Sequence, residues 1–259
     1  YYCGTALLES PFFLVAHLSS YLLDYELDGY SKLYPISINI SAIFYLIIGL
    51  IFLNATLDTY QIKNWQKSIT FFAAVFGTNL FYYTVGEPGM SHVFSFALVS
   101  LFYYYSRTYF LRNNKHHLLK LFLLLGLIVL TRPINGLIVF IIPFASGNFL
   151  TLKKGLIFSI RDKLWFILAV CVFLCVISIQ LVIYKISTGS FFIYAYAEEG
   201  FNFLSPHIAA ILFSYKKGLF LYTPLFLVAF AGCYFLWRTS RFEFFSWIGF
   251  FFVITFVLS

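Results

Sequence analysis

Long apolar runs, separated by short polar segments, occupy most of the chain after residue 35. A membrane-crossing helix needs ~20 mainly apolar residues, so runs of this kind predict membrane spans. We predict about eight transmembrane segments, at residues 36–54, 68–86, 91–110, 118–131, 134–150, 164–184, 219–236 and 244–259. Because proline removes a backbone donor and disfavours helix before it, we expect two short helices that meet at Arg132, ahead of Pro133. A single kinked helix is the alternative.

The first segment, residues 1–23, has a different pattern. Its apolar run is interrupted by Glu9, Ser10, Pro11 and His17, and ionisable groups are costly in lipid. We therefore expect an amphipathic helix that lies in the outer membrane interface or is re-entrant. A membrane-crossing helix is the alternative. The predicted fold class is an all-α polytopic membrane protein, with residues 1–259 as a single transmembrane domain and 185–218 as an outer loop.

Composition excludes a soluble enzyme. The 259 residues are 61% hydrophobic, 10% charged and 23% aromatic, whereas soluble domains average about 45–50% apolar and about 25% charged residues. A chain with so little charge cannot cover a water-facing surface. Abundant Phe and Tyr also suit the aromatic belts at membrane interfaces. We expect an integral membrane protein whose main partner is the lipid bilayer.

The net charge of +7 is explained by topology and does not indicate a nucleic-acid partner. Twelve of the 17 Lys and Arg residues fall on alternate connections, which the positive-inside rule assigns to the cytoplasm. These are Lys63, Lys67, Arg107, Arg112, Lys115, Lys120, Lys153, Lys154, Arg161, Lys163, Arg238 and Arg241. The outer side keeps Lys32, Arg132, Lys185, Lys216 and Lys217.

The cysteines indicate neither a disulfide framework nor a metal site. Cys3, Cys171, Cys175 and Cys233 form no C-x-x-C pair, and three of them lie in apolar runs. We expect no metal and no cofactor. Binding of a divalent cation by the loop acids Asp24, Glu26 and Asp28 stays open as an alternative.

The connection 84–92 carries the first candidate chemistry. Glu87 stands between Gly86 and Pro88, and His92 follows five residues later at the start of a span. An ionisable residue at membrane depth is by default a functional candidate, so Glu87 is a candidate base with His92 as its partner. The alternative is a solvated turn acid and a histidine that caps its own helix.

The second group of candidates would bind a sugar and a phosphate. Arginine binds phosphate through two parallel hydrogen bonds, lysine supplies a point charge, and aromatic faces pack on sugar rings. We predict substrate-binding roles for Arg132, Tyr194, Tyr196, Glu198, Glu199, His207, Lys216 and Lys217. The alternative is an interfacial aromatic belt with basic anchors that reach to lipid phosphates.

Several of these segments resemble a known family. Residues 1–13 read Y-x-x-G-x-x-L-L followed by P-F, the loop before the third span ends in Met90-Ser91-His92, and Thr131-Arg132-Pro133 interrupts a helix. With the stretch 213–225, these are similar to segments of the GT-C glycosyltransferases, in the group of protein mannosyltransferases and aminoarabinose transferases. The resemblance covers most of the chain.

The resemblance implies an inverting transfer of a sugar from a polyprenyl-phosphate donor, on the outer face of a bacterial inner membrane. In that family the catalytic carboxylate precedes the Y-x-x-G segment, with which this chain begins. We therefore expect a piece cut at both ends, without its main base and inactive alone. Glu87 and His92 would then be supporting catalytic residues.

Two other classes compete with a transferase. A transporter or flippase of lipid-linked saccharides would carry charged residues inside discontinuous helices, whereas most ionisable residues here stand at span ends. A structural membrane subunit is the third reading, with the aromatic and acidic outer loop as an interaction surface.

Overall fold

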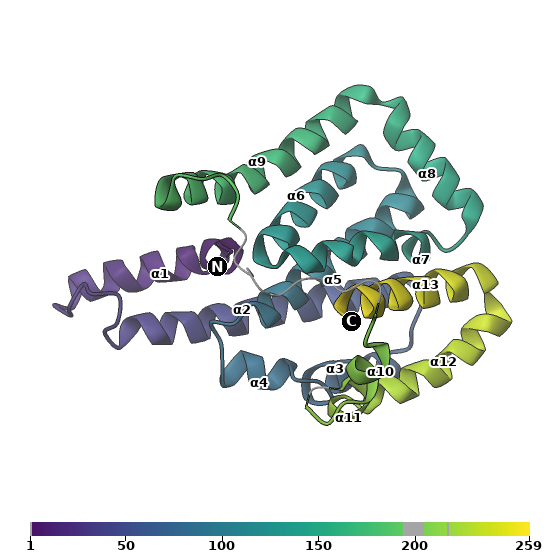
Figure 1. Cartoon of the computed structure of the whole chain (residues 1–259), viewed down its shortest axis with the longest axis horizontal. Helices are drawn as coiled ribbons and strands as arrows, with labels where there is room; N and C mark the ends of the chain where they lie inside the picture. Colours follow the sequence, from purple (N-terminus) through teal and green to yellow (C-terminus); the bar gives the residue numbers. More distant parts are fainter. Residues whose placement is uncertain (1, 194–204, 217) are drawn as a thin grey trace.

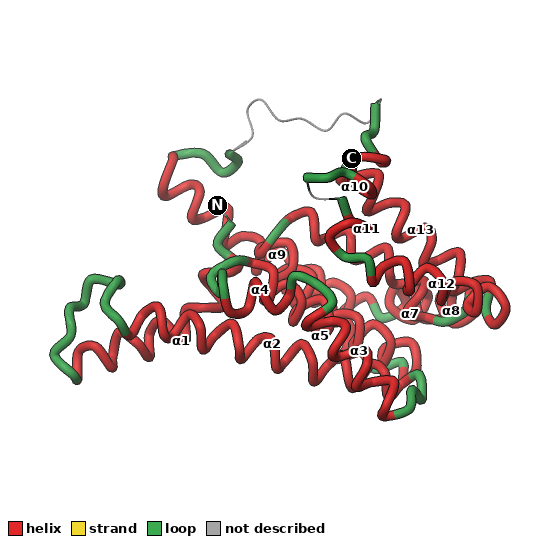
Figure 2. The backbone as a smooth tube through the Cα atoms, turned by 90° about the horizontal axis from the view of Figure 1, so that it is seen from below, coloured by secondary structure: helices red, strands yellow, loops and turns green. Residues whose placement is uncertain are grey.

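The computed structural model describes residues 2–193, 205–216 and 218–259, and within these ranges all regular structure is helical (Figures 1 and 2). The first half contains α1 (Gly4–Leu22), α2 (Leu33–Thr59), α3 (Asn64–Phe76), α4 (Leu80–Val85), α5 (Ser91–Arg112) and α6 (Lys115–Thr131). The second half contains the 3₁₀ helix η1 (Pro133–Ile141), then α7 (Ile142–Ser146), α8 (Phe149–Arg161), α9 (Lys163–Thr188), α10 (Ile208–Phe213), α11 (Leu219–Tyr222), α12 (Leu225–Thr239) and α13 (Arg241–Leu258).

Helix α5 forms the centre of the packed core. It lies between α2 and α6, while α1 packs on α2 and α9 packs on α6. Val93, Phe94 and Phe102 of α5 are almost fully buried, as is Ile128 of α6. Because α5 is enclosed by other helices, its amino-terminal end is held firmly against its neighbours.

Two glycines allow the closest helix contacts. A Cβ added at Gly49 of α2 would stand 2.5 Å from the Phe96 ring of α5, and one at Gly126 of α6 would stand 2.9 Å from Val176 of α9. Small residues let helix backbones approach closely, which is typical of helix packing in membranes.

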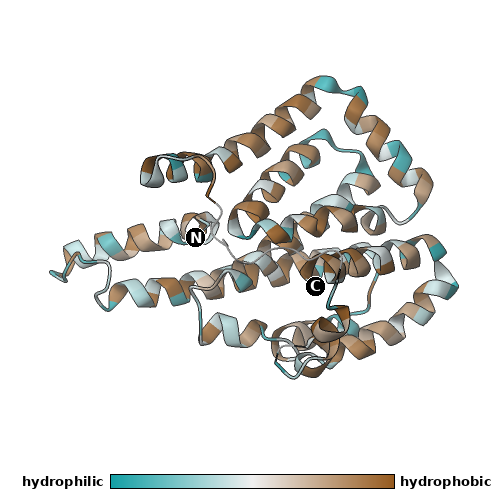
Figure 3. Ribbon diagram, in the orientation of Figure 1, coloured by the Kyte–Doolittle hydropathy of each residue, from teal (hydrophilic) through white to brown (hydrophobic). Residues whose placement is uncertain are grey.

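Three described helices are long and apolar enough to cross a membrane: α2, α9 and α13, with 27, 26 and 18 residues. Few of their residues are buried, and apolar side chains such as Leu164, Ile167 and Ile186 of α9 are exposed. Figure 3 shows hydrophobic residues along α9 and α13 and hydrophilic ones near α8. Such exposure is unfavourable in water and favourable in lipid, which indicates a membrane protein.

The structure does not support a count of eight spans. The expected span 68–86 is divided into α3 and α4 at Gly77-Thr78-Asn79, and 134–150 is divided into η1 and α7. The segment 219–236 is also split, because Pro224 separates α11 from α12. The all-helical class is confirmed, as is the meeting of two helices at Arg132, whose backbone is extended at φ −153°.

Two expected loops also differ. Residues 149–161, which include most of an expected cytoplasmic loop, form α8, and its lysines Lys153 and Lys154 are exposed. The expected outer loop 185–218 begins later, because α9 continues to Thr188 and α10 lies within the loop. Most of segment 1–23 forms α1 (Gly4–Leu22), and a helix was expected there; its place in the membrane interface stays a prediction.

The connections fall into two groups at opposite ends of the molecule. In Figure 1 the α1–α2 and α4–α5 connections, and the ends of α6 and α9, lie toward the left. The α2–α3, α5–α6 and α12–α13 connections, together with α8, lie toward the right. We call the first group the acidic end, because its connections carry Asp24, Glu26, Asp28 and Glu87. We call the second group the basic end, because the twelve residues assigned to the cytoplasm lie in α8 or in and near these connections.

Candidate functional site

Glu87 occupies a tight turn between α4 and α5 at the acidic end. The Met90 N–H donates to the Glu87 carbonyl at 3.0 Å, which closes the turn. The Tyr82 hydroxyl donates to Glu87 Oε1 at 2.8 Å and fixes the carboxylate. The second carboxylate oxygen remains available to accept a proton or a hydrogen bond.

His92 lies in the first turn of α5 and stacks on Tyr83 of α4. The two ring centroids are 3.8 Å apart and the ring planes differ by 23°. This stacking sets the orientation of the imidazole. The charges of Arg132 and Glu87 both act on His92, so the structure brings these three predicted site residues into one electrostatic neighbourhood.

Arg132 reaches this neighbourhood because the start of η1 is bonded to α5. The Asn135 side-chain amide donates to the Ser95 hydroxyl at 3.0 Å, and the Asn135 N–H donates to the Arg132 carbonyl at 2.9 Å. Ser95 stands three residues after His92, on the same face of α5. The Arg132 side chain is exposed and therefore accessible to an anion.

Glu9 of α1 is a further acid at this end that the sequence analysis treated only as a break in an apolar run. A Cβ added at Gly89 would stand 4.0 Å from Glu9 Oε1, so this carboxyl faces the α4–α5 turn. Glu9 Oε1 is buried without a hydrogen-bond partner among the described residues. Burial raises the pKa of the Glu9 carboxyl to about 7, and α1 is not one of the three candidate spans.

The amino-terminal half of α1 is attached to three other helices. The Tyr45 hydroxyl of α2 donates to the Leu8 carbonyl at 3.1 Å. The Cys3 N–H donates to Gln180 Oε1 of α9 at 2.7 Å. Gly4 packs on the backbone of α6 at Leu130, where a side chain would collide. These contacts hold Glu9 against the turn that carries Glu87.

The other predicted binding residues are not part of this cluster as described. His207 and Lys216 are exposed and flank α10, which packs against α11 and α13. In Figure 1, α10 lies below α13, away from the end of α6. Tyr194, Tyr196, Glu198, Glu199 and Lys217 lie outside the described residues, so their roles stay predictions.

No group of three potential metal ligands is found within the described ranges. Of the loop acids, Asp28 is used by its own turn: its Oδ1 accepts from the N–H groups of Tyr30 and Ser31 at 2.8 and 2.9 Å. These two bonds hold the pKa of Asp28 below its usual range. The carboxylate therefore serves the loop backbone in this conformation.

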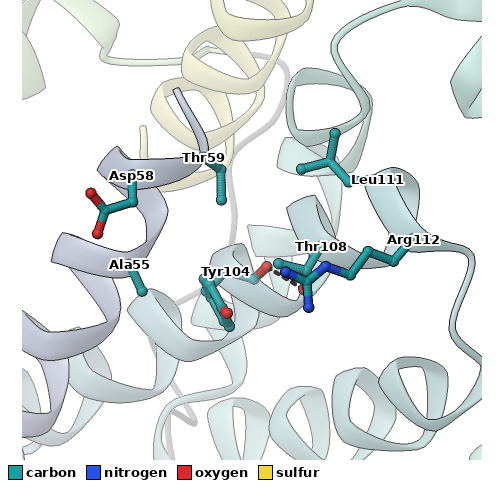
Figure 4. Close-up of a pocket in the computed structure, with 7 residues that line it drawn as sticks. All are labelled: Ala55, Asp58, Thr59, Tyr104, Thr108, Leu111 and Arg112. Atoms are coloured by element: carbon teal, nitrogen blue, oxygen red, sulfur yellow. Dashed lines mark hydrogen bonds between the residues drawn. The ribbon is translucent and has the colours of Figure 1, made fainter. Parts of the chain in front are cut away.

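A cavity of about 400 Å³ lies at the opposite, basic end, between the carboxyl-terminal turns of α2 and α5 (Figure 4). Asp58 of α2 and Arg112 of α5 stand on its two walls, and Asp58 forms an ion pair with Lys67. The cavity lies on the side that the positive-inside rule assigns to the cytoplasm, so it is separate from the site around Glu87.

The acidic end combines two carboxyl groups, an oriented imidazole and an exposed guanidinium. Such a set can accept a proton from a hydroxyl group and can bind an anion. Comparison of the chain with protein-family models, with curated proteins and with solved structures gave no match.

Proposed function

We propose that this protein transfers a sugar from a polyprenyl-phosphate donor to an acceptor hydroxyl on the non-cytoplasmic side of a bacterial inner membrane. The observation that supports the proposal most is the approach of Glu87, His92 and Arg132 at the acidic end. These residues come from two connections that are about forty-five positions apart in the sequence.

The chemistry of an inverting transfer matches this set of groups. One base must deprotonate the acceptor hydroxyl, and positive charge must stabilise the departing lipid phosphate. Glu87, oriented by the Tyr82 hydroxyl, is suited to support the first task. Arg132 is suited to the second, because a guanidinium stays charged at any physiological pH.

His92 connects the two tasks. Its ring is held by Tyr83, and the charges of Arg132 and Glu87 both act on it. In this position the imidazole can orient the acceptor hydroxyl, or relay the proton of that hydroxyl to Glu87. Glu9, whose pKa is raised by burial to about 7, can hold a proton near the same turn at neutral pH.

The number of membrane crossings follows from the same proposal. An outer site supplied by the α4–α5 connection and the α6–η1 junction requires α5 and α6, with 22 and 17 residues, to cross the bilayer along with α2, α9 and α13. The polar positions of α5 are then shielded by α2 and α6, which pack on both sides of it.

The test is turnover of a polyprenyl-phosphate sugar by the full-length protein that contains this chain, assayed in membranes. Glu87→Gln and His92→Ala should each lower kcat by ~10²-fold or more at equal expression, the size expected of an acid–base participant. Glu26→Gln, in the exposed α1–α2 loop of the same end, is the matched control and should keep full activity. Full activity in both site variants would disprove the proposal.

A further inference from the structure

The first turn of α1 lies within the helix bundle with unpaired backbone donors. Gly4 is buried, and the first intrahelical bond runs from the Leu7 N–H to the Cys3 carbonyl at 2.8 Å. The N–H groups of Gly4, Thr5 and Ala6 therefore have no acceptor within the helix. Since Cys3 provides no side-chain cap, this turn keeps unpaired donors and the positive end of the helix dipole, both of which favour an anion.

Gln180 of α9 adds an unpaired donor at the same place. Its side chain is only 5% exposed, and its Oε1 accepts the Cys3 N–H at 2.7 Å. An amide nitrogen cannot accept a hydrogen bond, so the acceptor is Oε1. The other polar atom of the same side-chain amide, Nε2, therefore also lies close to the first turn of α1. This Nε2 is buried and has no partner among the described residues. A buried amide donor is costly unless an acceptor is supplied.

Arg132 contributes a full positive charge next to this turn. Gly4 is in close contact with the backbone of Leu130 and Thr131, the two residues that precede Arg132. The turn is also open on one side, because Thr5 is half-buried and Ala6 is exposed. The backbone donors and the buried Gln180 amide thus meet at the start of α1, and Arg132 directly follows the two α6 residues that Gly4 contacts. This combination suits a phosphate group, which offers several strong acceptor oxygens.

We propose that the first turn of α1, Gln180 and Arg132 form a binding site for the phosphate of a membrane lipid. The inference deepens the proposed function, on which it rests, by assigning the donor phosphate to this turn. It also makes Gln180 a binding residue, although nothing in its sequence context sets it apart. A single-chain lipid phosphate fits the position, because the α9 face beside it is apolar and exposed at Ile179 and Ile183.

The test is binding of dodecyl phosphate to the protein in lipid nanodiscs, measured by isothermal titration calorimetry. Gln180→Glu keeps an oxygen that accepts the Cys3 N–H, but it replaces the Nε2 donor by a negatively charged oxygen, which repels the phosphate. Arg132→Gln removes the guanidinium at an exposed position, where it should not affect folding. Each substitution should weaken binding at least ~10-fold. Lys185→Gln is the control, because Lys185 is on the same helix and its Nζ donates to the Gly189 carbonyl.

Several outcomes separate the possibilities. Competition by inorganic phosphate supports recognition of the phosphate itself, and binding of dodecanol as tight as dodecyl phosphate overturns the site. An equal loss in the Lys185 variant also overturns it, since general surface charge would then explain binding. If Gln180→Glu does not fold, unchanged binding in Arg132→Gln is sufficient to reject the proposal. This experiment measures binding of a lipid phosphate and not sugar transfer. The binding site can therefore be supported even if the proposed transfer reaction is disproved.

Discussion

Glu9 is the residue whose environment has the clearest measurable consequence. Burial raises its pKa from 4.5 to about 7, so between these pH values the folded protein holds a proton that the unfolded chain releases. Stability from this group is therefore full below about pH 4.5 and is lost as the pH rises through about 7.

We predict that Glu9→Gln flattens the fall in stability between pH 4.5 and about 7. The side chain is only half-buried, so solvent screening reduces the effect to on the order of 1 kcal/mol. Thermal unfolding in detergent across this range measures it. Ser10→Ala, next to Glu9 on α1, keeps the carboxyl and should retain the slope of the parent protein. An unchanged slope in Glu9→Gln would show that this carboxyl is not responsible.

At the residue scale, the sequence revealed chemistry only where a residue type was unusual for its segment. Glu87 and Arg132 were identified because an acid in a Gly-Pro turn and an arginine before a proline are conspicuous in an apolar chain. Glu9 became a candidate only because the structure places its carboxyl near the α4–α5 turn. Gln180 became one because its side chain is bonded to the start of α1. Contacts over that sequence distance leave no local pattern.

Among the helices, close packing depends on particular glycines, as in the contact of α2 with α5. We predict that Gly49→Ala destabilises the protein by about 1–3 kcal/mol, because its Cβ would stand 2.5 Å from the Phe96 ring. Gly232→Ala in α12 is the matched control, since nothing lies within 4 Å of the added Cβ. It should be neutral or stabilise by ~0.5–1 kcal/mol through helix propensity.

Thermal unfolding of the two glycine variants in the same detergent checks this prediction. Equal stability of both variants would mean that α2 and α5 do not pack as closely as described. A greater loss in Gly232→Ala would instead place an unrecognised contact on α12.

Apolar runs predicted the long helices well and their interruptions poorly. The runs at 36–54 and 164–184 lie within α2 and α9, and all but the last residue of 244–259 lies within α13. The run 68–86 contains Gly77-Thr78-Asn79, a short cluster of turn-forming residues, but three positions are too few to end a run that is judged over about 20 residues. Residues 151–163 were expected as a loop because they separate two apolar runs, yet most of them form α8, and Lys and Arg are good helix formers.

The whole molecule has two chemically different ends, and its topology can be tested by labelling. We predict that Lys153→Cys, on the exposed face of α8, reacts only from the cytoplasm, and that Tyr30→Cys, in the α1–α2 loop, reacts from outside. The four native cysteines should first be replaced. A membrane-impermeant maleimide in intact cells gives the result. Labelling of Lys153→Cys from outside would reverse the assignment of the two ends.

The most direct test of the account is photo-crosslinking of a polyprenyl phosphate that carries a diazirine near its phosphate. We predict crosslinks in peptides that contain residues 2–9, 86–92 and 130–136, because these segments surround the proposed donor site. Crosslinks confined to α8 and the α5–α6 connection would place the lipid phosphate at the basic end, and would contradict the account.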